Sequence, residues 1–428
     1  MGIAKIVMME FSYNDDNFYI LRNLLRIQRA FGIGTAKAYE AYKTIKESDI
    51  INCDAYTVYK MLPEKFAKPF YNVKREYNDR IMNMCSDNGI GILCIEDKEY
   101  PKRLKELYSP PLLLYYKGTL PDIDELPALC IVGPRKVTEF GAKSAYSLAF
   151  RLARAGFPII SGAAVGSDYY AHRGALDAGG FTIGVLGCGL LYDYLPQNAQ
   201  LRKEISEKGC LISEYPPFCQ PGKFTFPVRN RIMAALSVGV AVTEAGEGSG
   251  ALNTAHQAAD LNKDVFAVPG NPTLEQYKGS NKLLREGALP LIDTSDIFNC
   301  YLAEYADKFN VERAFSKSEA VPKFVFPAPN SRLKRTSPAK THEPFDFSDK
   351  KEDIKLSDIF EKKSVKTLSK EAQIVYNYID KQKFSADDIL GSGLSDDGIL
   401  SALTELEMEK LIKALPGGFY ELSDKEIV

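Results

Sequence analysis

The chain has 428 residues, a length that corresponds to about three domains at roughly 150 residues each. Apolar residues make up 45% of it and charged residues 26%, so the composition predicts buried cores and excludes a chain that is disordered throughout. The formal net charge of −2 supplies no general attraction to nucleic acid, so any such binding has to come from a local basic patch.

Cysteine and histidine usage narrows the class of protein further. Eight cysteines are scattered without a Cys-x-x-Cys pair, which indicates neither a disulfide framework nor a zinc ribbon. The histidines are His172, His256 and His342, too far apart for a histidine-rich metal site. The apolar runs are too short to span a membrane, and the first residues lack the order of a secretory signal. We therefore expect a cytoplasmic protein without cofactor, metal or membrane contact.

Residues 1–86 are predicted to form a small helical domain. Apolar side chains recur at helical spacing from Leu21 to Ile27, and a turn containing Gly32 and Gly34 then separates two helices. This turn resembles a helix-hairpin-helix turn, in which glycine amides can face a phosphate. A plain turn inside a helical domain explains the same residues, and one short match does not decide between the two interpretations.

Residues 87–305 are predicted to form an α/β core with a parallel sheet. Apolar runs of strand length alternate with amphipathic helical stretches such as 141–155 and 168–178. The predicted strands are 129–133, 158–161, 182–187, 211–214, 239–244, 265–269 and 289–292. Ligands of such sheets bind at the carboxyl ends of the strands, so we expect the functional residues in the loops that follow them.

The last part of the chain is predicted to be a linker and a small domain. Residues 306–365 are rich in Pro, Ser and charge and lack apolar periodicity, which is typical of a flexible linker. Residues 366–428 regain helical periodicity and end in a Gly-Gly hairpin. Three helices followed by such a hairpin indicate a winged helix.

Two of the strand-to-helix loops have the composition of phosphate-binding loops. Arg135, followed by Lys136, comes directly after the first strand, where a guanidinium suits a phosphate. A surface arginine without a ligand is the plain alternative. The next loop contains Ser161, Gly162 and Gly166, whose small size lets backbone amides approach an anion, with Asp168 placed to cap the following helix.

A later loop combines cations with aromatic rings. It contains Lys223 and Phe226, followed by Arg229, Asn230 and Arg231. Arginines donate to phosphates and flat rings stack on bases, so this cluster favours nucleic-acid binding. The plain alternatives are that Phe226 belongs to the core and that Asn230 satisfies backbone groups of the loop.

The remaining strand ends add small residues and charges. Ser249 and Gly250 open a helix and offer amides to an anion, and Lys278 and Asn281 complete the same sheet edge. Glu244, at a strand end, suits a general base or a ribose-binding carboxylate, which keeps an enzyme open as an alternative.

Catalytic signatures are scarce in the sequence. His172 lies one turn into a helix, a position more typical of a structural histidine than of a base. No nucleophile elbow, His-Glu-x-x-His helix or Cys-His pairing is visible. We therefore predict a binding protein rather than an enzyme.

Together these motifs resemble the DprA/Smf family of bacterial DNA-processing proteins over about 200 residues, from Tyr100 to Ala288. The motifs are Tyr100-Pro101, Pro110-Pro111-Leu112-Leu113-Leu114-Tyr115, Gly133-x-Arg135, Ser161-Gly162-x-Ala164-x-Gly166-x-Asp168, Ser213-Glu214-Tyr215-Pro216-Pro217, Phe226-Pro227-x-Arg229-Asn230-Arg231-Ile232, Glu244-Ala245, Ser249-Gly250, Pro269-Gly270 and Gly279-x-Asn281.

The resemblance implies an extended Rossmann-like core between a helical N-terminal domain, similar to a sterile-alpha-motif or helix-hairpin-helix unit, and a C-terminal winged helix. It also implies a protein that binds and protects single-stranded DNA, loads the RecA recombinase onto it during natural transformation or recombination, and forms a homodimer. By the same resemblance, the DNA-binding pocket contains Arg135, the Ser161-Gly162 loop, Lys223, Phe226 and the stretch from Arg229 to Arg231.

The sequence departs from the family at two pocket positions. Pro134 stands where the family usually has Ser or Thr, and Val165 stands where a basic residue is frequent, so Lys136 and Lys278 are candidates for replacing the missing phosphate contacts. A Rossmann-like enzyme related to phosphoribohydrolases, which binds or hydrolyses nucleotides, is the main alternative. Its loop pattern is absent from residues 245–250. A partner adaptor that does not bind DNA is the third possibility.

Overall fold

The computed structural model describes residues 15–222 and 224–316, Val321, and single residues and short segments between Ser369 and Leu422. By their internal contacts the residues form two compact units, Met1–Phe345 and Asp346–Val428. Among the described residues, no helix is long and apolar enough to cross a lipid bilayer.

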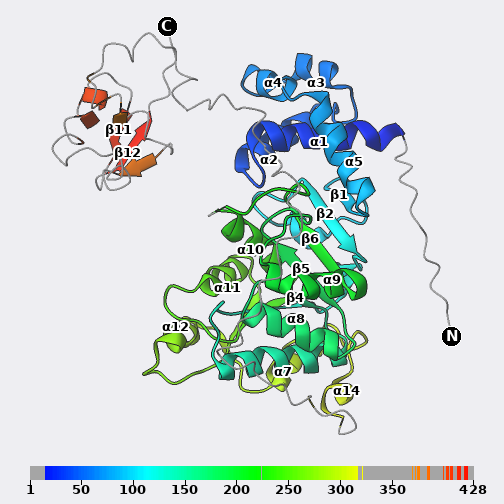
Figure 1. The fold of residues 1–428 in the computed structure, drawn as a ribbon, viewed down its shortest axis with the longest axis vertical. Coiled ribbons are helices and arrows are strands. Elements are labelled where there is room, and N and C mark those ends of the chain that lie inside the picture. Colours follow the sequence, from blue (N-terminus) through cyan, green and yellow to red (C-terminus); the bar gives the residue numbers. More distant parts are fainter. Residues whose placement is uncertain are drawn as a thin grey trace. The chain divides into compact units, whose positions relative to one another are not determined.

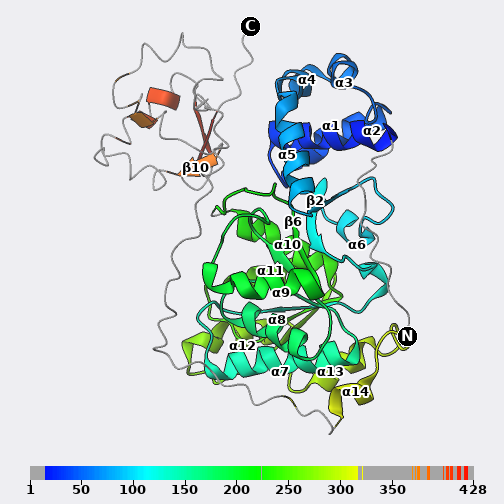
Figure 2. The same ribbon diagram turned by 45° about the vertical axis from the view of Figure 1, so that its right-hand side comes forward.

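The N-terminal part of the first unit is helical. Its helices are α1 (Asp15–Phe31), α2 (Ala36–Glu47), α3 (Ala55–Met61), α4 (Glu64–Tyr71) and α5 (Arg75–Asp87). The apolar residues predicted to share one face of α1 are buried, with Leu21 and Leu24 fully inaccessible. Thr35 and Asp54 cap α2 and α3 by accepting hydrogen bonds from backbone amides of the first turn. In both views α5 lies at the β1–β2 end of the sheet, and α3 and α4 lie farther from it (Figures 1 and 2).

One large sheet forms the centre of the first unit. Its strands are β1 (Gly91–Cys94), β2 (Leu113–Gly118), β3 (Leu129–Val132), β4 (Ile159–Ser161), β5 (Thr182–Leu186), β6 (Cys210–Ser213), β7 (Gly239–Val242), β8 (Asp264–Ala267) and β9 (Leu289–Pro290). They lie in the order β1-β2-β6-β5-β4-β3-β7-β8-β9. β1 and β2 are antiparallel to their neighbours. The strands from β6 to β9 in the sheet order, which include β5, β4 and β3, are parallel to one another. The predicted α/β class is therefore confirmed, and each predicted strand is present within two residues of its expected bounds.

Helices cover both faces of this sheet. They are α6 (Lys102–Lys105), α7 (Glu139–Ala155), α8 (Ser167–Asp177), α9 (Ala199–Lys208), α10 (Thr225–Leu236), α11 (Gly250–Asp260), α12 (Lys278–Arg285), α13 (Thr294–Tyr301) and α14 (Val311–Phe315). Alternate residues of β3 pack into different cores because successive side chains of a strand point to opposite faces. Ile131 belongs to the core under α7 and α8, whereas Val132 belongs to the core that contains Met233 of α10.

The order of the strands creates a switch point between β3 and β7. From β3 the chain proceeds through β4 and β5 to β6, and α10 then returns it to β7 on the other side of β3. The loops after β3 and β7 consequently leave the sheet toward opposite faces. A crevice opens between such loops, at the carboxyl ends of the strands.

The second unit contains a small antiparallel sheet. Strands β10 (Lys383–Ser385), β12 (Phe419–Leu422) and β11 (Ile412–Leu415) pair in that order. The predicted helices of residues 366–428 lie largely outside the described residues, so the winged helix stays a prediction. The predicted linker, residues 306–365, begins too early, because α14 lies within it and Phe309 and Ala314 belong to the core that contains α7. From residue 317 onward it lies outside the described residues except for Val321.

Candidate nucleic-acid interface

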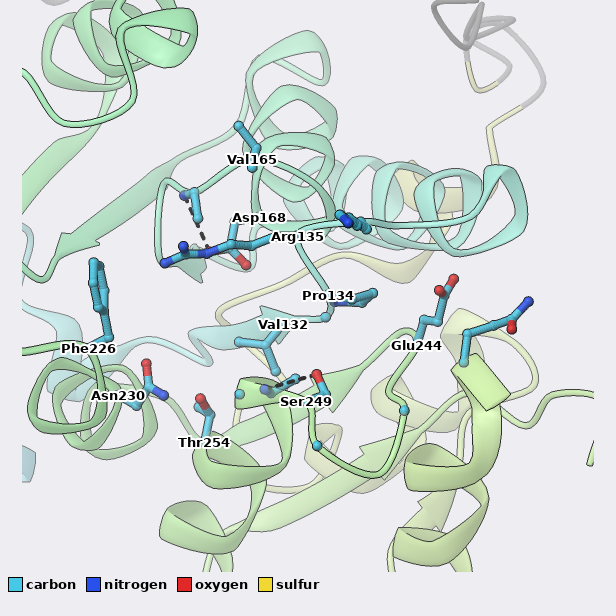
Figure 3. A pocket seen from close by; sticks show the side chains of 18 of the residues that line it. Val132, Pro134, Arg135, Val165, Asp168, Phe226, Asn230, Glu244, Ser249 and Thr254 are labelled. Atoms are coloured by element: carbon cyan, nitrogen blue, oxygen red, sulfur yellow. Dashed lines mark hydrogen bonds between the residues drawn. The ribbon is translucent and has the colours of Figure 1, made fainter. Parts of the chain in front are cut away.

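A cavity of about 810 Å³ lies at the switch point, at the carboxyl ends of β3 and β7 (Figure 3). It brings together Arg135, Lys136, Phe226, Arg229, Asn230, Ser249 and Gly250 from the set predicted by sequence. Its other lining residues include Ala164, Val165, Asp168, Met233, Glu244, Glu247, Thr254, Glu275 and Gln276. We call this cavity the switch-point pocket.

The loop after β3 presents two cations to this pocket. Gly133 passes close to Ser167 and Thr243, where a β-carbon would collide with the Ser167 hydroxyl, so glycine permits this close approach. Arg135 and Lys136 lie in the bend that follows and are exposed to solvent. Exposed guanidinium and ammonium groups keep their hydration until an anion arrives, so both are placed to bind phosphate.

Phe226 lies in the first turn of α10, and its ring is beside the Arg135 side chain. Its ring is half-buried, with its centroid 5.0 Å from Arg135 Cζ and 5.4 Å from the ring centroid of Tyr194. Gly187 faces this ring closely, since a β-carbon there would lie 2.9 Å from Phe226 Cδ1. The ring is therefore held in place and still lines the pocket, as a stacking platform requires.

Arg229 is a buried arginine whose guanidinium donates hydrogen bonds to backbone carbonyls. Only 6% of its surface is exposed. Its Nη1 donates to Gly162 O at 2.8 Å and to Val185 O at 2.6 Å. Its Nε donates to Asn230 Oδ1 at 3.1 Å, and the Asn230 amide donates in turn to Asn253. Burial lowers the pKa of Arg229, and the nearby Asp168 carboxylate opposes that shift. Arg229 thus joins the loop after β4 to β5, a positioning role that the phosphate interpretation did not anticipate.

The glycine-rich loop after β4 is shaped by packing. A β-carbon on Gly162 would collide with Arg229 Nη1 and lie 2.6 Å from Asp168 Oδ2. Gly166 has φ +85° and packs against the Pro134 carbonyl. Ser161 is buried and donates to Ile131 O at 2.7 Å. These three predicted residues support the pocket from behind and do not line it.

Carboxylates line part of the pocket. Glu244 is buried, accepts from Thr138 Oγ1 at 2.6 Å and from the Thr138 amide at 3.2 Å, and has a pKa raised by burial. Asp168 accepts from the Ala164 amide at 3.4 Å and does not cap α8, whose N-cap is Gly166. Burial also raises the pKa of Asp168, and the Arg229 charge opposes this. The pocket therefore carries acceptors as well as the cations predicted from sequence.

The structure places other predicted residues outside the pocket lining. Arg231 pairs with the buried Glu214 at 2.6 Å. Lys278 pairs with Glu275 at 2.5 Å, and Asn281 exchanges hydrogen bonds with the Gly270 backbone at 3.0 and 3.1 Å. Lys223 lies outside the described residues.

The family is decided by comparison with known proteins. The model of the family described as DNA recombination-mediator protein A matches residues 91–302. The DNA processing protein DprA of Bacillus subtilis is 37% identical over 219 residues, which cover 51% of this chain and 74% of that protein. The chain belongs to the DprA/Smf family.

Two further relatives agree with this assignment. The protein Smf of Synechocystis is 40% identical over 205 residues, and the match spans 47% of this chain and 52% of that protein, about half its length. The X-ray structure of DNA processing protein A from Streptococcus pneumoniae covers 66% of this chain and 97% of its own, with 32% identity and a TM-score of 0.57. The family match contains every residue that lines the switch-point pocket and ends before the second unit.

His172 is a structural residue, in agreement with the interpretation from sequence. It is fully buried, its Nε2 accepts from the Ala163 amide at 3.2 Å, and its Nδ1 lies 2.7 Å from Thr182 Oγ1. Thr182 Oγ1 donates to Ile159 O, so it accepts from Nδ1–H. Burial lowers the pKa of His172 to about 3, which keeps the ring neutral at physiological pH.

Proposed function

We propose that this protein binds single-stranded DNA in the switch-point pocket and acts as a recombination mediator. The observation that carries the proposal is the exposed Arg135 beside the half-buried ring of Phe226, in a pocket that the exposed Lys136 also lines. Cations that bind phosphates and rings that stack on bases are the usual elements of single-strand binding sites. Membership of the DprA/Smf family supports the same conclusion.

The distribution of charge in the pocket suggests how a strand is oriented. Phosphates contact Arg135, Lys136 and the amides at the N-terminus of α11, where Gly250 faces open space. Carboxylates such as Glu247 repel phosphates and accept hydrogen bonds from base amino groups. In this arrangement the backbone follows the basic loop, one base stacks on Phe226, and base edges face the acidic lining.

The mediator role is expected to consist of loading the RecA recombinase onto bound single strands, with the protein acting as a homodimer. Both statements rest on the family resemblance. A single-strand-dependent RecA ATPase assay with a competing single-strand-binding protein tests the first. Stimulation of RecA by this protein supports loading, and unchanged RecA activity contradicts it.

Arg135→Ala is expected to weaken single-strand binding about fivefold, equivalent to about 1 kcal/mol, because an exposed phosphate contact is lost. The slope of log affinity against log salt should fall by about 0.7 for that contact. Fluorescence anisotropy with a labelled single strand over a salt series measures both. Lys203→Ala, which removes an exposed cation of α9 outside the pocket, is the matched control and should change neither. Equal binding by the folded Arg135→Ala variant and the wild type would exclude this loop from the site.

Nucleotide hydrolysis is the second candidate function, because Glu244 and Asp168 are buried carboxylates of raised pKa that line a pocket. Against it, Glu244 is engaged by Thr138, and no nucleophile-base pair lies beside it among the residues that line the pocket. We expect no release of base, nucleoside or phosphate above background from nucleotides or DNA. Turnover that persists through repurification and disappears in Glu244→Gln would establish an enzyme.

A further inference from the structure

The switch-point pocket is small for a ligand as long as a DNA strand. A cavity of about 810 Å³ is of the size that holds one drug-sized molecule, which corresponds to one or two nucleotides. A protein that covers single strands therefore needs further contacts outside this pocket. Exposed aromatic rings and a lysine, which are suited to such contacts, occur on α3 and α4.

Three tyrosines form a cluster on these two helices, which we call the tyrosine patch: Tyr56, Tyr59 and Tyr71. The ring centroids of Tyr59 and Tyr71 lie 4.6 Å apart, and those of Tyr56 and Tyr71 lie 6.3 Å apart. Tyr56 is 51% exposed and Tyr71 is 47% exposed. The cluster is thus accessible on the surface of the helical region.

Tyr59 packs against the hydrophobic core, but the core does not account for the exposed rings of Tyr56 and Tyr71. The buried positions of α3 and α4 are already filled by Val58, Phe66 and Phe70. Met61, at the end of α3, adds a further large apolar side chain that is 55% exposed. Large apolar side chains gathered at a surface are typical of a binding site.

Basic residues are frequent in the segment that carries the tyrosine patch. Between residues 54 and 76 the cations are Lys60, Lys65, Lys68, Lys74 and Arg75, and the acidic residues are Asp54, Glu64 and Glu76. Lys65 pairs with Glu40, and Arg75 pairs with Asp79. Lys60 Nζ lies 4.4 Å from the ring centroid of Tyr56, so a cation and an exposed ring share one site. Lys60 is therefore the cation that the structure places at the patch, within a segment of five basic and three acidic residues. An anionic ligand with flat apolar groups is complementary to it.

The glycine turn between α1 and α2 is not placed to bind such an anionic ligand. A β-carbon on Gly34 would lie 2.8 Å from Arg231 Nη2 and 3.1 Å from Glu214 Oε2, so the turn packs on the ion pair of the α/β core. The phosphate contact considered for this turn is therefore blocked at Gly34. In both ribbon views α3 and α4 lie at the end of the helical region away from the sheet (Figures 1 and 2).

We propose that the tyrosine patch with Lys60 is a second binding surface for single-stranded DNA, which engages the part of a strand that extends beyond the switch-point pocket. The inference rests on the proposed function of that pocket. Unpaired bases offer their faces to the tyrosine rings, whereas the bases of a duplex are already stacked on one another. Lysines around the rings neutralise the phosphates between those bases.

The test uses the full chain and labelled oligo-dT strands of about six and about 40 nucleotides, the shorter of which fills little more than one site. Tyr56→Ala and Lys60→Glu should each weaken binding of the long strand about fivefold and leave binding of the short strand unchanged. Tyr108→Ala is the control, because Tyr108 is 87% exposed elsewhere on the surface and should affect neither strand. Circular dichroism and the melting temperature confirm that each variant is folded.

Each result decides between the two proposals. Unchanged long-strand binding by folded Tyr56→Ala and Lys60→Glu variants would overturn the second surface and favour another occupant, such as an acidic protein. Equal losses for the two strand lengths would also overturn it. If Arg135→Ala leaves both lengths unaffected while Tyr56→Ala weakens the long strand, the pocket assignment fails and the tyrosine patch stands.

Discussion

Arg229→Ala is expected to destabilise the α/β core by about 3–5 kcal/mol, which is the usual cost of removing one partner from a buried charge network. The substitution leaves the carbonyls of Gly162 and Val185 without this donor, and it leaves the buried Asp168 carboxylate without the nearby positive charge. Gly162 lies in the loop after β4, Val185 in β5 and Asp168 in α8, so the substitution weakens contacts between three parts of the core. The melting temperature of the core transition measures it.

Arg135→Ala is the matched control for stability, because Arg135 is exposed and its removal should change the unfolding free energy by less than about 0.5 kcal/mol. The two substitutions are therefore expected to have different effects: Arg229→Ala lowers stability, and Arg135→Ala lowers DNA affinity. An Arg229→Ala variant that melts at the wild-type temperature and loses DNA binding would show that Arg229 is a DNA contact instead.

Phe226→Ala is expected to weaken single-strand binding by between about fivefold and a hundredfold, because a stacking ring contributes about 1–3 kcal/mol per base. Phe226→Tyr should bind nearly as tightly, since it keeps the flat ring. Phe224→Ala is a nearby control: Phe224, the N-cap of α10, is 75% exposed but does not line the pocket, so its removal should have little effect. Anisotropy titrations at one stated salt concentration compare the variants.

The rival interpretation, that Phe226 is a core residue, makes a different prediction. Its ring also touches Tyr194 and lies close to Gly187, so removal leaves some space behind. If packing were its whole role, Phe226→Ala would lower the melting temperature and leave the affinity of the folded protein unchanged. That combination of results would show that Phe226 does not stack on a base.

The parallel part of the fold was predictable from sequence because its strands are buried on both faces and read as uninterrupted apolar runs. β4 to β7 are buried at every position, and the corresponding runs were identified within two residues. β1 and β2 were not predicted. They are antiparallel to their neighbours and precede the alternation of strands and helices from which the parallel strands were predicted.

The candidate site was predictable only in part. Arg229 and Arg231 look equivalent in sequence, but residues two apart on a helix point to different sides. Arg229 consequently reaches the loop after β4, and Arg231 reaches Glu214. The glycines after β4 were read as amide donors, whereas Gly162 and Gly166 are required by close packing. Such contacts depend on residues far apart in the chain, which periodicity and loop composition do not reveal.

Photochemical cross-linking tests the central claim most directly, namely that single-stranded DNA occupies the switch-point pocket. A strand containing 4-thiothymidine is bound to the full-length protein, irradiated and digested, and the cross-linked peptides are identified by mass spectrometry. We predict cross-links to the pocket residues Arg135, Lys136 and Phe226, which an excess of unlabelled strand suppresses. Saturable binding whose cross-links all lie outside the residues lining the pocket would contradict the claim, as would the absence of saturable binding.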